Sequence, residues 1–165
     1  MKLIDDFAGR FNATISLDES LVVMKQNRLF LLNKNLKRLV SERFFYVGTY
    51  LGKVKGGTFF PSFHLLSMIA EHKANKTVVD EKTEWLFICG RDVFKQGIAK
   101  VMGSRRKSDY TLVLNKHGEC LGFGKIVRNI DSETDMHAVV VTNISDIGDF
   151  LRRERRISHF RPSEV

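Results

Sequence analysis

The stretch Leu121-Gly122-Phe123-Gly124-Lys125-Ile126 decides the fold that we expect for the second half of this chain. It acts together with an earlier string, Cys89-Gly90-Arg91-Asp92-Val93-Phe94-Lys95-Gln96-Gly97-Ile98-Ala99-Lys100-Val101. Each string places glycine inside an apolar, strand-like run, where the backbone must turn sharply or another segment must pack closely. Neither string carries a catalytic group. We therefore expect a small, tightly packed β domain whose glycines serve its architecture.

The sequence around these strings contains further apolar runs of strand length. They lie at 85–88, 98–102, 110–114, 119–127 and 137–142, with turns at Gly103-Ser104 and His117-Gly118. Among these runs only residues 90–96 are expected to form a helical turn, and a closing helical turn is expected at 146–151. Five short strands at this spacing favour a small barrel or a curled sheet.

The first half of the chain mixes helical and strand patterns. Apolar residues at helical spacing predict a helix over 2–11, and the runs 21–25 and 28–32 predict a hairpin around Gln26-Asn27. A short helix is expected through Val40, with Leu36, Leu39 and Val40 facing inward. The remaining elements are a β-rich run at 44–54, a Gly56-Gly57 turn, a helix from Pro61 and a strand at 77–79.

The predicted fold class is therefore α+β. An N-terminal α/β domain with a small antiparallel sheet is expected at residues 1–81, and a mostly β domain at 82–165. The boundary is placed at the polar stretch Asp80-Glu81-Lys82-Thr83, which lies between β runs and contains neither glycine nor proline.

The charge of the chain favours an anionic partner. The sequence holds 27 basic and 19 acidic residues, a net charge of +8, and its pI is about 9.7. Nucleic acid is the first partner that such a balance suggests, followed by an acidic protein or a membrane surface. Arginine is skewed toward the end of the chain, where four arginines occupy five positions. We call Arg152, Arg153, Arg155 and Arg156 the arginine cluster.

The arginine cluster is the best functional candidate in the sequence. Four neighbouring cations repel one another, and a bound phosphate backbone would relieve that repulsion. The alternative interpretation of the cluster is a solvated, fraying terminus without a ligand. Lys95 and Lys125 flank glycines and are candidates to line a groove, or are ordinary solvent-facing lysines. The Arg105-Arg106-Lys107 run extends a phosphate track or is simply an exposed loop.

Catalytic and metal-binding patterns are missing from the sequence. His64 and His72 are eight residues apart without a cysteine or carboxylate to complete a zinc site. The string from Gly90 to Gly97 lacks the ending of a phosphate loop, and no nucleophile elbow occurs. Cys89 and Cys120 are expected to be buried free thiols. No stretch has the length of a membrane span or the apolar core of a signal peptide, so we expect no membrane association and a cytoplasmic or nuclear location.

A set of short segments between Tyr46 and Arg153 carries a family pattern. They are Gly48-Thr49, Gly52-Lys53, Phe63-His64, Gly90, Val93, Gly97, Leu121-Gly122-Phe123-Gly124, Ala138-Val139-Val140-Val141 and Asp146-Ile147-Gly148. Their order resembles the Nip-seven ribosome-biogenesis proteins, and the short start of the chain indicates an archaeal member. The resemblance implies a C-terminal PUA pseudobarrel from about residue 82 and no catalysis.

The resemblance also implies a function and a binding site. It implies a non-catalytic RNA-binding protein, without cofactor or metal, in large ribosomal subunit biogenesis and pre-rRNA processing. Single-stranded, uridine-rich RNA is the expected ligand, and the RNA-binding residues carried over are Arg152, Arg153, Arg155, Arg156, Lys95 and Lys125. The N-terminal domain of a monomeric chain is expected to contact other ribosome-assembly proteins. The location is cytoplasmic, or nucleolar and nuclear in a eukaryote. The alternatives are an RNA-binding accessory subunit of an RNA-modification enzyme and a protein adaptor within a pre-ribosomal complex.

Overall fold

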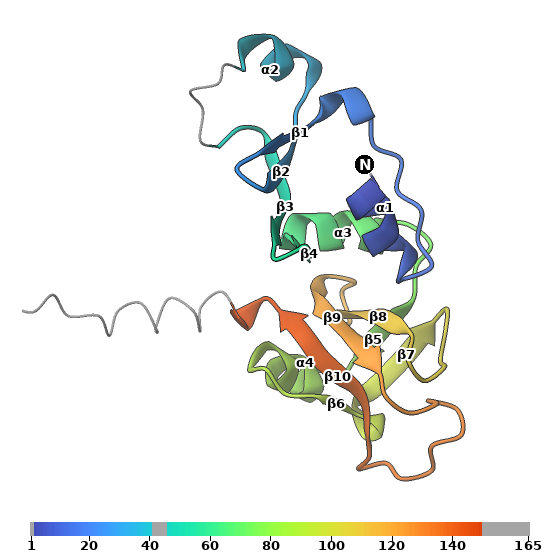
Figure 1. Ribbon diagram of the computed structural model, residues 1–165. Helices are drawn as coiled ribbons and strands as arrows, with labels where there is room; N and C mark the ends of the chain where they lie inside the picture. Colours follow the sequence, from blue (N-terminus) through green and yellow to red (C-terminus); the bar gives the residue numbers. More distant parts are fainter. Residues whose placement is uncertain (1, 41–45, 150–165) are drawn as a thin grey trace, which may run out of the picture. The chain divides into compact units, whose positions relative to one another are not determined.

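The computed structural model describes residues 2–40 and 46–149. The chain forms two compact units, Met1–Ala74 and Asn75–Val165, which are described separately below (Figure 1). The first unit contains α1 (Lys2–Gly9), β1 (Val22–Lys25), β2 (Arg28–Leu31), α2 (Lys34–Leu39), β3 (Thr49–Lys55), β4 (Thr58–Pro61) and α3 (Phe63–Glu71). A 3₁₀ turn, Glu19–Leu21, precedes β1.

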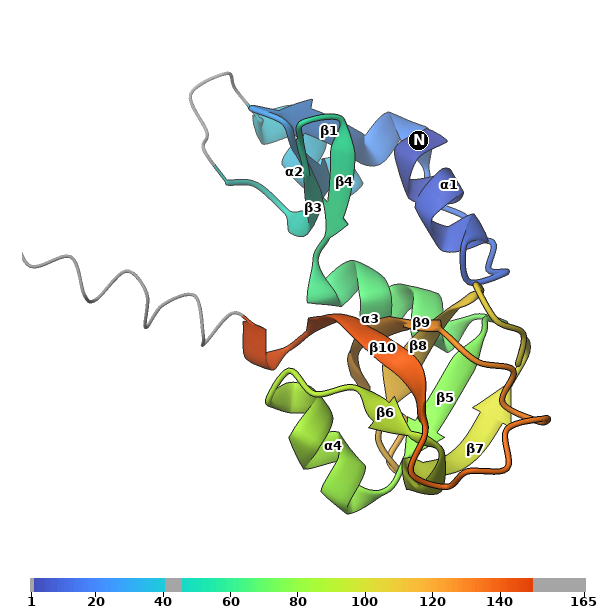
Figure 2. The same ribbon diagram turned by 60° about the horizontal axis from the view of Figure 1, so that its bottom comes forward.

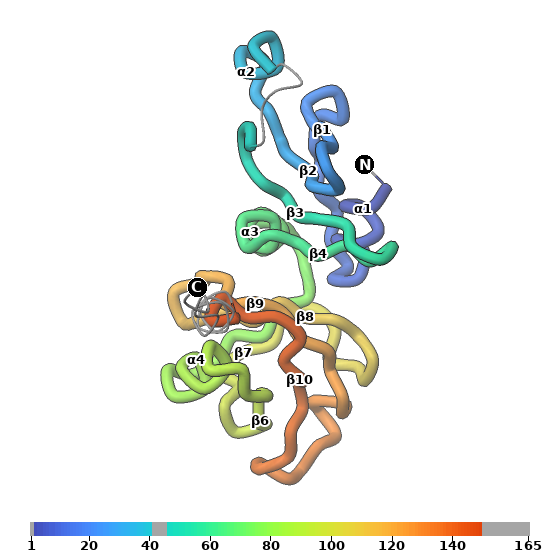
Figure 3. Tube along the Cα trace, turned by 60° about the vertical axis from the view of Figure 1, so that its left-hand side comes forward, coloured from blue at the N-terminus to red at the C-terminus, as the bar shows by residue number. Residues whose placement is uncertain are grey.

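The first unit is built on an antiparallel sheet with the strand order β1-β2-β3-β4, which can be followed in Figure 3. Gln26 and Asn27 connect β1 and β2 with φ angles of 48° and 61°. Both central residues of a type I′ turn need positive φ, so the predicted hairpin at this position is confirmed. Gly56 and Gly57 form the next turn, between β3 and β4, with φ angles of 56° and 75°.

Helices α1 and α3 supply much of the core of the first unit. Ile4, Phe7 and Ala8 of α1 are buried, and the Phe7 ring lies 5.6 Å from the Phe59 ring of β4. In α3, three buried residues follow the Ser62 cap: Leu65, Leu66 and Ile69. This helix begins at Phe63 and not at Pro61, because Pro61 pairs with Gly52 in the sheet.

Helix α2 begins as predicted but does not face inward. The side chain of its cap, Asn33, accepts a hydrogen bond from the Leu36 N–H at 2.7 Å. Leu39, however, is 72% exposed, so its predicted burial is wrong. At only six residues, the helix is too short to present a continuous apolar stripe.

The second unit is a curled six-stranded sheet with one covering helix (Figure 2). Its elements are β5 (Lys76–Val79), α4 (Glu81–Ile88), β6 (Val93–Phe94), a 3₁₀ turn (Lys95–Gly97), β7 (Ile98–Met102), β8 (Tyr110–Leu114), β9 (Cys120–Ile126) and β10 (Val139–Asp146). The strand order is β6-β10-β9-β8-β5-β7, and only the β5–β8 pair is parallel. With the antiparallel sheet of the first unit, this architecture confirms the predicted α+β class.

Strand β5 belongs to the second unit and not to the first half, where the sequence had placed it. Its residues pair with β7 on one side and with β8 on the other. The two units therefore divide between Ala74 and Asn75, whereas the sequence placed the boundary after Glu81. A local polar stretch did not predict the boundary, because strand pairing over 19 to 36 residues sets which unit this segment joins.

Two segments of the second unit differ from their predicted structure. Residues 85–88, expected as a strand, end helix α4, because Asp80 Oδ1 accepts from the Thr83 N–H at 2.7 Å and starts a helix that buries Thr83 and Phe87, four apart. Residues 90–96, expected as a helical turn, form β6 and the start of the 3₁₀ turn, because Val93 and Phe94 pair with β10.

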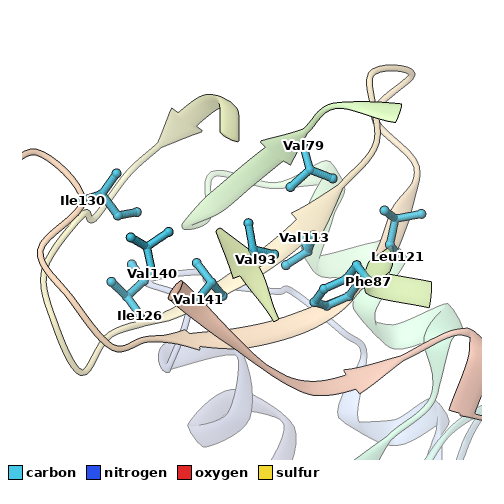
Figure 4. Packing of buried hydrophobic residues seen from close by; sticks show 9 residues of the cluster. All are labelled: Val79, Phe87, Val93, Val113, Leu121, Ile126, Ile130, Val140 and Val141. Carbon is cyan, nitrogen blue, oxygen red and sulfur yellow. The ribbon is translucent and has the colours of Figure 1, made fainter. Parts of the chain in front are cut away.

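The core of the second unit draws side chains from β5, α4, β6, β8, β9 and β10 (Figure 4). It consists of Val79, Phe87, Val93, Val113, Leu121, Ile126, Ile130, Val140 and Val141. Glycines allow these elements to approach. A Cβ at Gly124 would lie 2.5 Å from Cγ1 of Val141, and one at Gly122, where φ is 150°, would lie 2.8 Å from Cα of Asp146. The glycines of β9 therefore allow β10 to pack closely against this strand.

Candidate nucleic-acid interface

The end of α4 is fixed by a glycine turn. Gly90 adopts a φ of 88°, and its N–H donates to the Phe87 carbonyl at 2.9 Å. The N–H of Arg91 donates to the Leu86 carbonyl at 3.0 Å. These bonds satisfy carbonyl groups that the helix end would otherwise leave without partners. These bonds fix the path of the chain after the helix, and Arg91 is exposed there.

Asn143 of β10 ties this turn to the end of the last described strand. Its side-chain amide donates to the Phe87 carbonyl at 2.9 Å, to the Arg91 carbonyl at 3.4 Å and to Oδ2 of Asp146 at 3.1 Å. The Asn143 N–H donates to Oδ1 of Asp92 at 2.9 Å. One residue thus joins the turn after α4 to β10, the strand that leads into the arginine cluster.

Three large side chains of α4 and of the end of the second unit's last strand are exposed. Trp85, the only tryptophan, lies on α4 and is 67% exposed. Ile144 and Ile147, at the end of β10, are 47% and 46% exposed. An exposed indole ring is suited to stack on an unpaired base, and an arginine is suited to hold phosphate. Trp85 was not predicted as a site residue, because residues 85–88 were expected to form a strand.

Lys125 lies in β9, where it pairs with Tyr110 of β8 and Thr142 of β10. Its ammonium group is 5.9 Å from the centre of the Tyr110 ring. Lys125 is half-buried, and its neighbour Ile126 belongs to the core, so Lys125 points to the other face of the sheet. Tyr110 is also half-buried.

Lys95 has a structural partner. Its ammonium group donates to the carbonyl of Ile130, and its backbone N–H donates to the Ala138 carbonyl at 2.9 Å. Both acceptors lie in the connection between β9 and β10. Lys95 therefore anchors that connection, and β10 separates it from Lys125 in the sheet. The structure does not bring these two candidate lysines together.

The Arg105-Arg106-Lys107 run lies in a tightly bonded loop between β7 and β8. The Ile130 N–H donates to the Arg105 carbonyl at 3.0 Å, and the Lys107 N–H donates to Oδ1 of Asn129 at 2.7 Å. Arg105 also forms an ion pair with Asp131 at 2.9 Å. Within residues 2–40 and 46–149, no ion pair is formed by Arg106 or Lys107, and both are exposed.

The two units differ in how many basic and acidic residues they hold. Residues 1–74 hold 11 basic and 6 acidic residues, and residues 75–149 hold 11 of each. Residues 150–165 hold 5 basic and 2 acidic residues. The excess positive charge of the second unit is therefore carried by the segment with the arginine cluster, which lies outside the described residues.

The two cysteines are less buried than predicted. Both are free thiols, but Cys89 is exposed, because it follows the last turn of α4 and does not lie in a strand. Burial raises the pKa of the Cys120 thiol to about 11, and a backbone hydrogen bond with Gly122 opposes this shift. The predicted burial is therefore wrong for Cys89, whereas Cys120 is half-buried.

Metal-binding clusters and membrane-spanning helices are both absent from the described part of the chain. There, no group of three or more histidine, cysteine, aspartate or glutamate side chains is placed to hold a metal ion. No described helix has the length and apolar character needed to cross a bilayer.

Comparison with known proteins gives three kinds of match. Residues 75–155 match the family model of the UPF0113 PUA domain. The 60S ribosome subunit biogenesis protein NIP7 homolog of Danio rerio is 25% identical over 138 residues, which cover 79% of this chain and 77% of that protein. A UPF0113 protein of Archaeoglobus fulgidus is 27% identical over 117 residues, which cover 70% of this chain and 66% of that protein.

Solved structures share the fold over nearly the whole chain. A conserved PUA domain protein from Thermoplasma acidophilum has a TM-score of 0.60 and 22% identity, covering 93% of this chain and 92% of its own. A hypothetical protein from Pyrococcus horikoshii has a TM-score of 0.56 and 16% identity, with the same two coverages.

Proposed function

The chain is a Nip-seven-like PUA-domain protein with its UPF0113 PUA domain at residues 75–155, and from this premise we propose that it binds RNA without catalysis. Its proposed role is in large ribosomal subunit biogenesis and pre-rRNA processing. One observation carries the proposal: the similarity to a 60S ribosome subunit biogenesis protein extends over 79% of the chain, beyond the PUA domain alone.

We propose that RNA lies along the end of α4 and the end of β10 and continues onto the arginine cluster. Asn143 fixes the first two elements to each other, and Trp85 and Arg91 present a stacking ring and a cation beside them. Because residues 75–149 have no net charge, the arginine cluster supplies the phosphate contacts that bring RNA to this unit.

Single-stranded, uridine-rich RNA fits such an interface best. A surface with an exposed indole binds bases that are already unstacked, and pyrimidine runs stack weakly in a single strand. Lys125, beside the Tyr110 ring, is a further proposed contact. The ammonium group of Lys95 donates to the Ile130 carbonyl. We therefore propose that Lys95 contributes to RNA binding indirectly, by positioning the segment between β9 and β10.

A salt titration tests this proposal. Binding of a fluorescein-labelled ten-nucleotide oligouridylate is measured by anisotropy between 50 and 200 mM salt. Four phosphate contacts on a single strand give a log–log slope of about −2.8, a loss of about fifty-fold in affinity over this range. Replacing the four residues of the arginine cluster with alanine should flatten the slope by that amount and leave the melting temperature unchanged. Unaltered affinity and slope would exclude the cluster, and absence of binding by the unmodified chain would refute the function.

We further propose that the first unit contacts other ribosome-assembly proteins. The observation that favours this is the exposure of two large apolar side chains, Leu39 at 72% and Met24 at 57%. Replacing both with glutamate should abolish capture of assembly factors while RNA affinity is retained. Co-purification of the unmodified chain with an RNA-modifying enzyme, and not with ribosomal precursors, would favour the accessory-subunit alternative.

A further inference from the structure

The sheet of the first unit carries positive charge and no negative charge. Its four strands contain Lys25, Arg28, Lys53 and Lys55, and none of them contains an aspartate or a glutamate. The acidic residues described in this unit lie instead on α1, on the turn before β1 and at the end of α3. The strands are therefore the part of this unit that is complementary to an anion.

Three of these cations are aligned in one row. Lys25 of β1 pairs with Arg28 of β2, Arg28 pairs with Lys53 of β3, and Lys53 pairs with Phe60 of β4. Side chains that are directly opposite in antiparallel strands point to the same face. We call Lys25, Arg28 and Lys53 the cation row. It crosses three strands and ends at Phe60, which is 40% exposed.

An aromatic cluster lies next to the cation row and consists of Phe30, Tyr46 and Tyr50. The rings of Tyr46 and Tyr50 lie 5.2 and 5.6 Å from the Phe30 ring, and 5.9 Å from each other. The Arg28 guanidinium sits 5.6 Å from the centre of the Tyr46 ring. Phe30 is fully buried, whereas Tyr46 is 60% exposed. The buried ring thus supports an outer ring that faces solvent beside a cation.

The opposite face of the sheet is used by the core. Phe59 alternates with Phe60 along β4 and packs its ring 5.6 Å from that of Phe7 in α1. Leu29, which alternates with Arg28, is 4% exposed. The face with the cation row also buries Phe30, but it leaves Tyr46 and Phe60 exposed, at 60% and 40%.

The cations of α2 differ from those of the cation row because they have an acidic neighbour. Lys34 and Lys37 lower the pKa of Asp18, to a smaller extent than its hydrogen bonds with Ser20 do, so their charge is partly offset. No ion pair within the described residues involves Arg28 or Lys53. The pairs Arg28/Lys53 and Lys34/Lys37 therefore provide matched variants, and the second pair lies near the carboxylate of Asp18.

We propose that the face formed by the cation row, Phe60 and the aromatic cluster is a second binding surface for single-stranded RNA. Cations at strand spacing hold phosphates, and Tyr46 and Phe60 stack on bases. An acidic protein would match the charge but would not need exposed rings beside it, so RNA is the occupant that both features fit. The inference rests on the proposed RNA-binding function and extends it to the first unit.

The test compares two double variants of the full chain, Arg28→Gln/Lys53→Gln and Lys34→Gln/Lys37→Gln. Both remove two positive charges from the same unit. The probe is a fluorescein-labelled oligouridylate of twenty nucleotides, long enough to engage two surfaces. Loss of two phosphate contacts should flatten the log–log salt slope by about 1.4 and weaken binding about 25-fold at 0.1 M salt. The α2 variant should keep the slope and affinity of the unmodified chain.

A second pair of variants tests the stacking part. Tyr46→Ala should weaken binding about fivefold or more, whereas Tyr46→Phe, which keeps the ring, should bind like the unmodified chain. Melting temperatures within a few degrees of the unmodified chain show that the sheet is intact. Equal affinities for the two double variants, or equal affinities for Tyr46→Ala and Tyr46→Phe, would overturn the proposal.

The outcomes separate this inference from the proposed function. If the sheet variants bind normally and the arginine-cluster variant does not, the second surface is refuted and the RNA-binding function stands. If the unmodified chain binds no RNA, both fail. Normal RNA binding by the Arg28→Gln/Lys53→Gln variant, combined with loss of an acidic protein partner, would assign the face to protein recognition and overturn the inference.

Discussion

Substitution of Gly97 by alanine tests the claim that glycines set the architecture of the second unit. Gly97 ends the 3₁₀ turn after β6 and lies against α4. A Cβ at this position would be 2.9 Å from both Cβ and Cγ2 of Thr83, and closer still to Oγ1. Ordinary contacts between such atoms are about 3.5–4.0 Å, so α4 must move or the turn must distort.

The expected cost follows from overpacking a filled site. One added methyl group in a close-packed region costs about 1–3 kcal/mol, so Gly97→Ala should lower the free energy of unfolding by about 2 kcal/mol. For a unit of this size, that corresponds to a fall of roughly 8–16 °C in melting temperature. Thr83→Ala removes Oγ1 and Cγ2, so the double variant should recover more than 1 kcal/mol of the loss through a favourable coupling energy.

Fluorescence of Trp85 provides the assay, because the only tryptophan of the chain lies on α4 and reports on the second unit. Unfolding by urea is followed for the four members of the cycle. Gly9→Ala is the control, since a Cβ at Gly9 meets nothing within 4 Å. A Gly97→Ala variant as stable as the unmodified chain, or additive effects at Gly97 and Thr83, would refute this account of the glycine.

Four further predictions address the interface and the thiols. Trp85→Ala should weaken oligouridylate binding about fivefold or more in an anisotropy titration, whereas Trp85→Phe should retain most of the affinity; equal losses would remove stacking as the reason. Asn143→Ala removes three side-chain hydrogen bonds at the junction of α4 and β10 and should cost about 2–3 kcal/mol in urea unfolding, with an unchanged midpoint as the contrary result. At pH 8, a thiol reagent should label exposed Cys89 quickly and Cys120 only after denaturation; two fast equivalents would contradict the burial. Because the pKa of Cys120 rises from 9.0 to about 11 on folding, the unfolded chain ionises first, so the free energy of unfolding should decline as pH rises from about 9 to 11.

Much of the fold follows from local patterns in the sequence. The hairpin at Gln26-Asn27 was predicted from two apolar runs around a short polar turn, and the strands around Gly122 and Gly124 from their apolar alternation. These patterns are local, so a single sequence is enough to read them. The family pattern added the PUA-type architecture, which apolar periodicity alone did not specify.

The errors arose where residues outside an apolar run decide its structure. Residues 85–88 are apolar over a strand length, yet the Asp80 cap five residues earlier places them in a helix. β5 joined the other unit because its partners, β7 and β8, lie far along the chain. Leu39 was expected inside because it is apolar, but it lies in a six-residue helix and is 72% exposed.

The candidate site was harder to predict than the fold. Lys95 was singled out for its place beside a glycine, but its ammonium group is held by the Ile130 carbonyl, a contact that depends on the path of the connection from β9 to β10. The cation row was missed because Lys25, Arg28 and Lys53 meet only through strand register. Trp85 would have been found by testing helical as well as strand spacing around it.

Photocrosslinking tests the central claim most directly, that the second unit holds RNA at the ends of α4 and β10 and on the arginine cluster. The full chain is saturated with a 4-thiouridine oligonucleotide, irradiated, digested and analysed by mass spectrometry. The account predicts adducts in the peptides that contain Trp85, Arg91 and residues 143–156. Saturation of the chain with RNA but without adducts anywhere in residues 75–165 would contradict it.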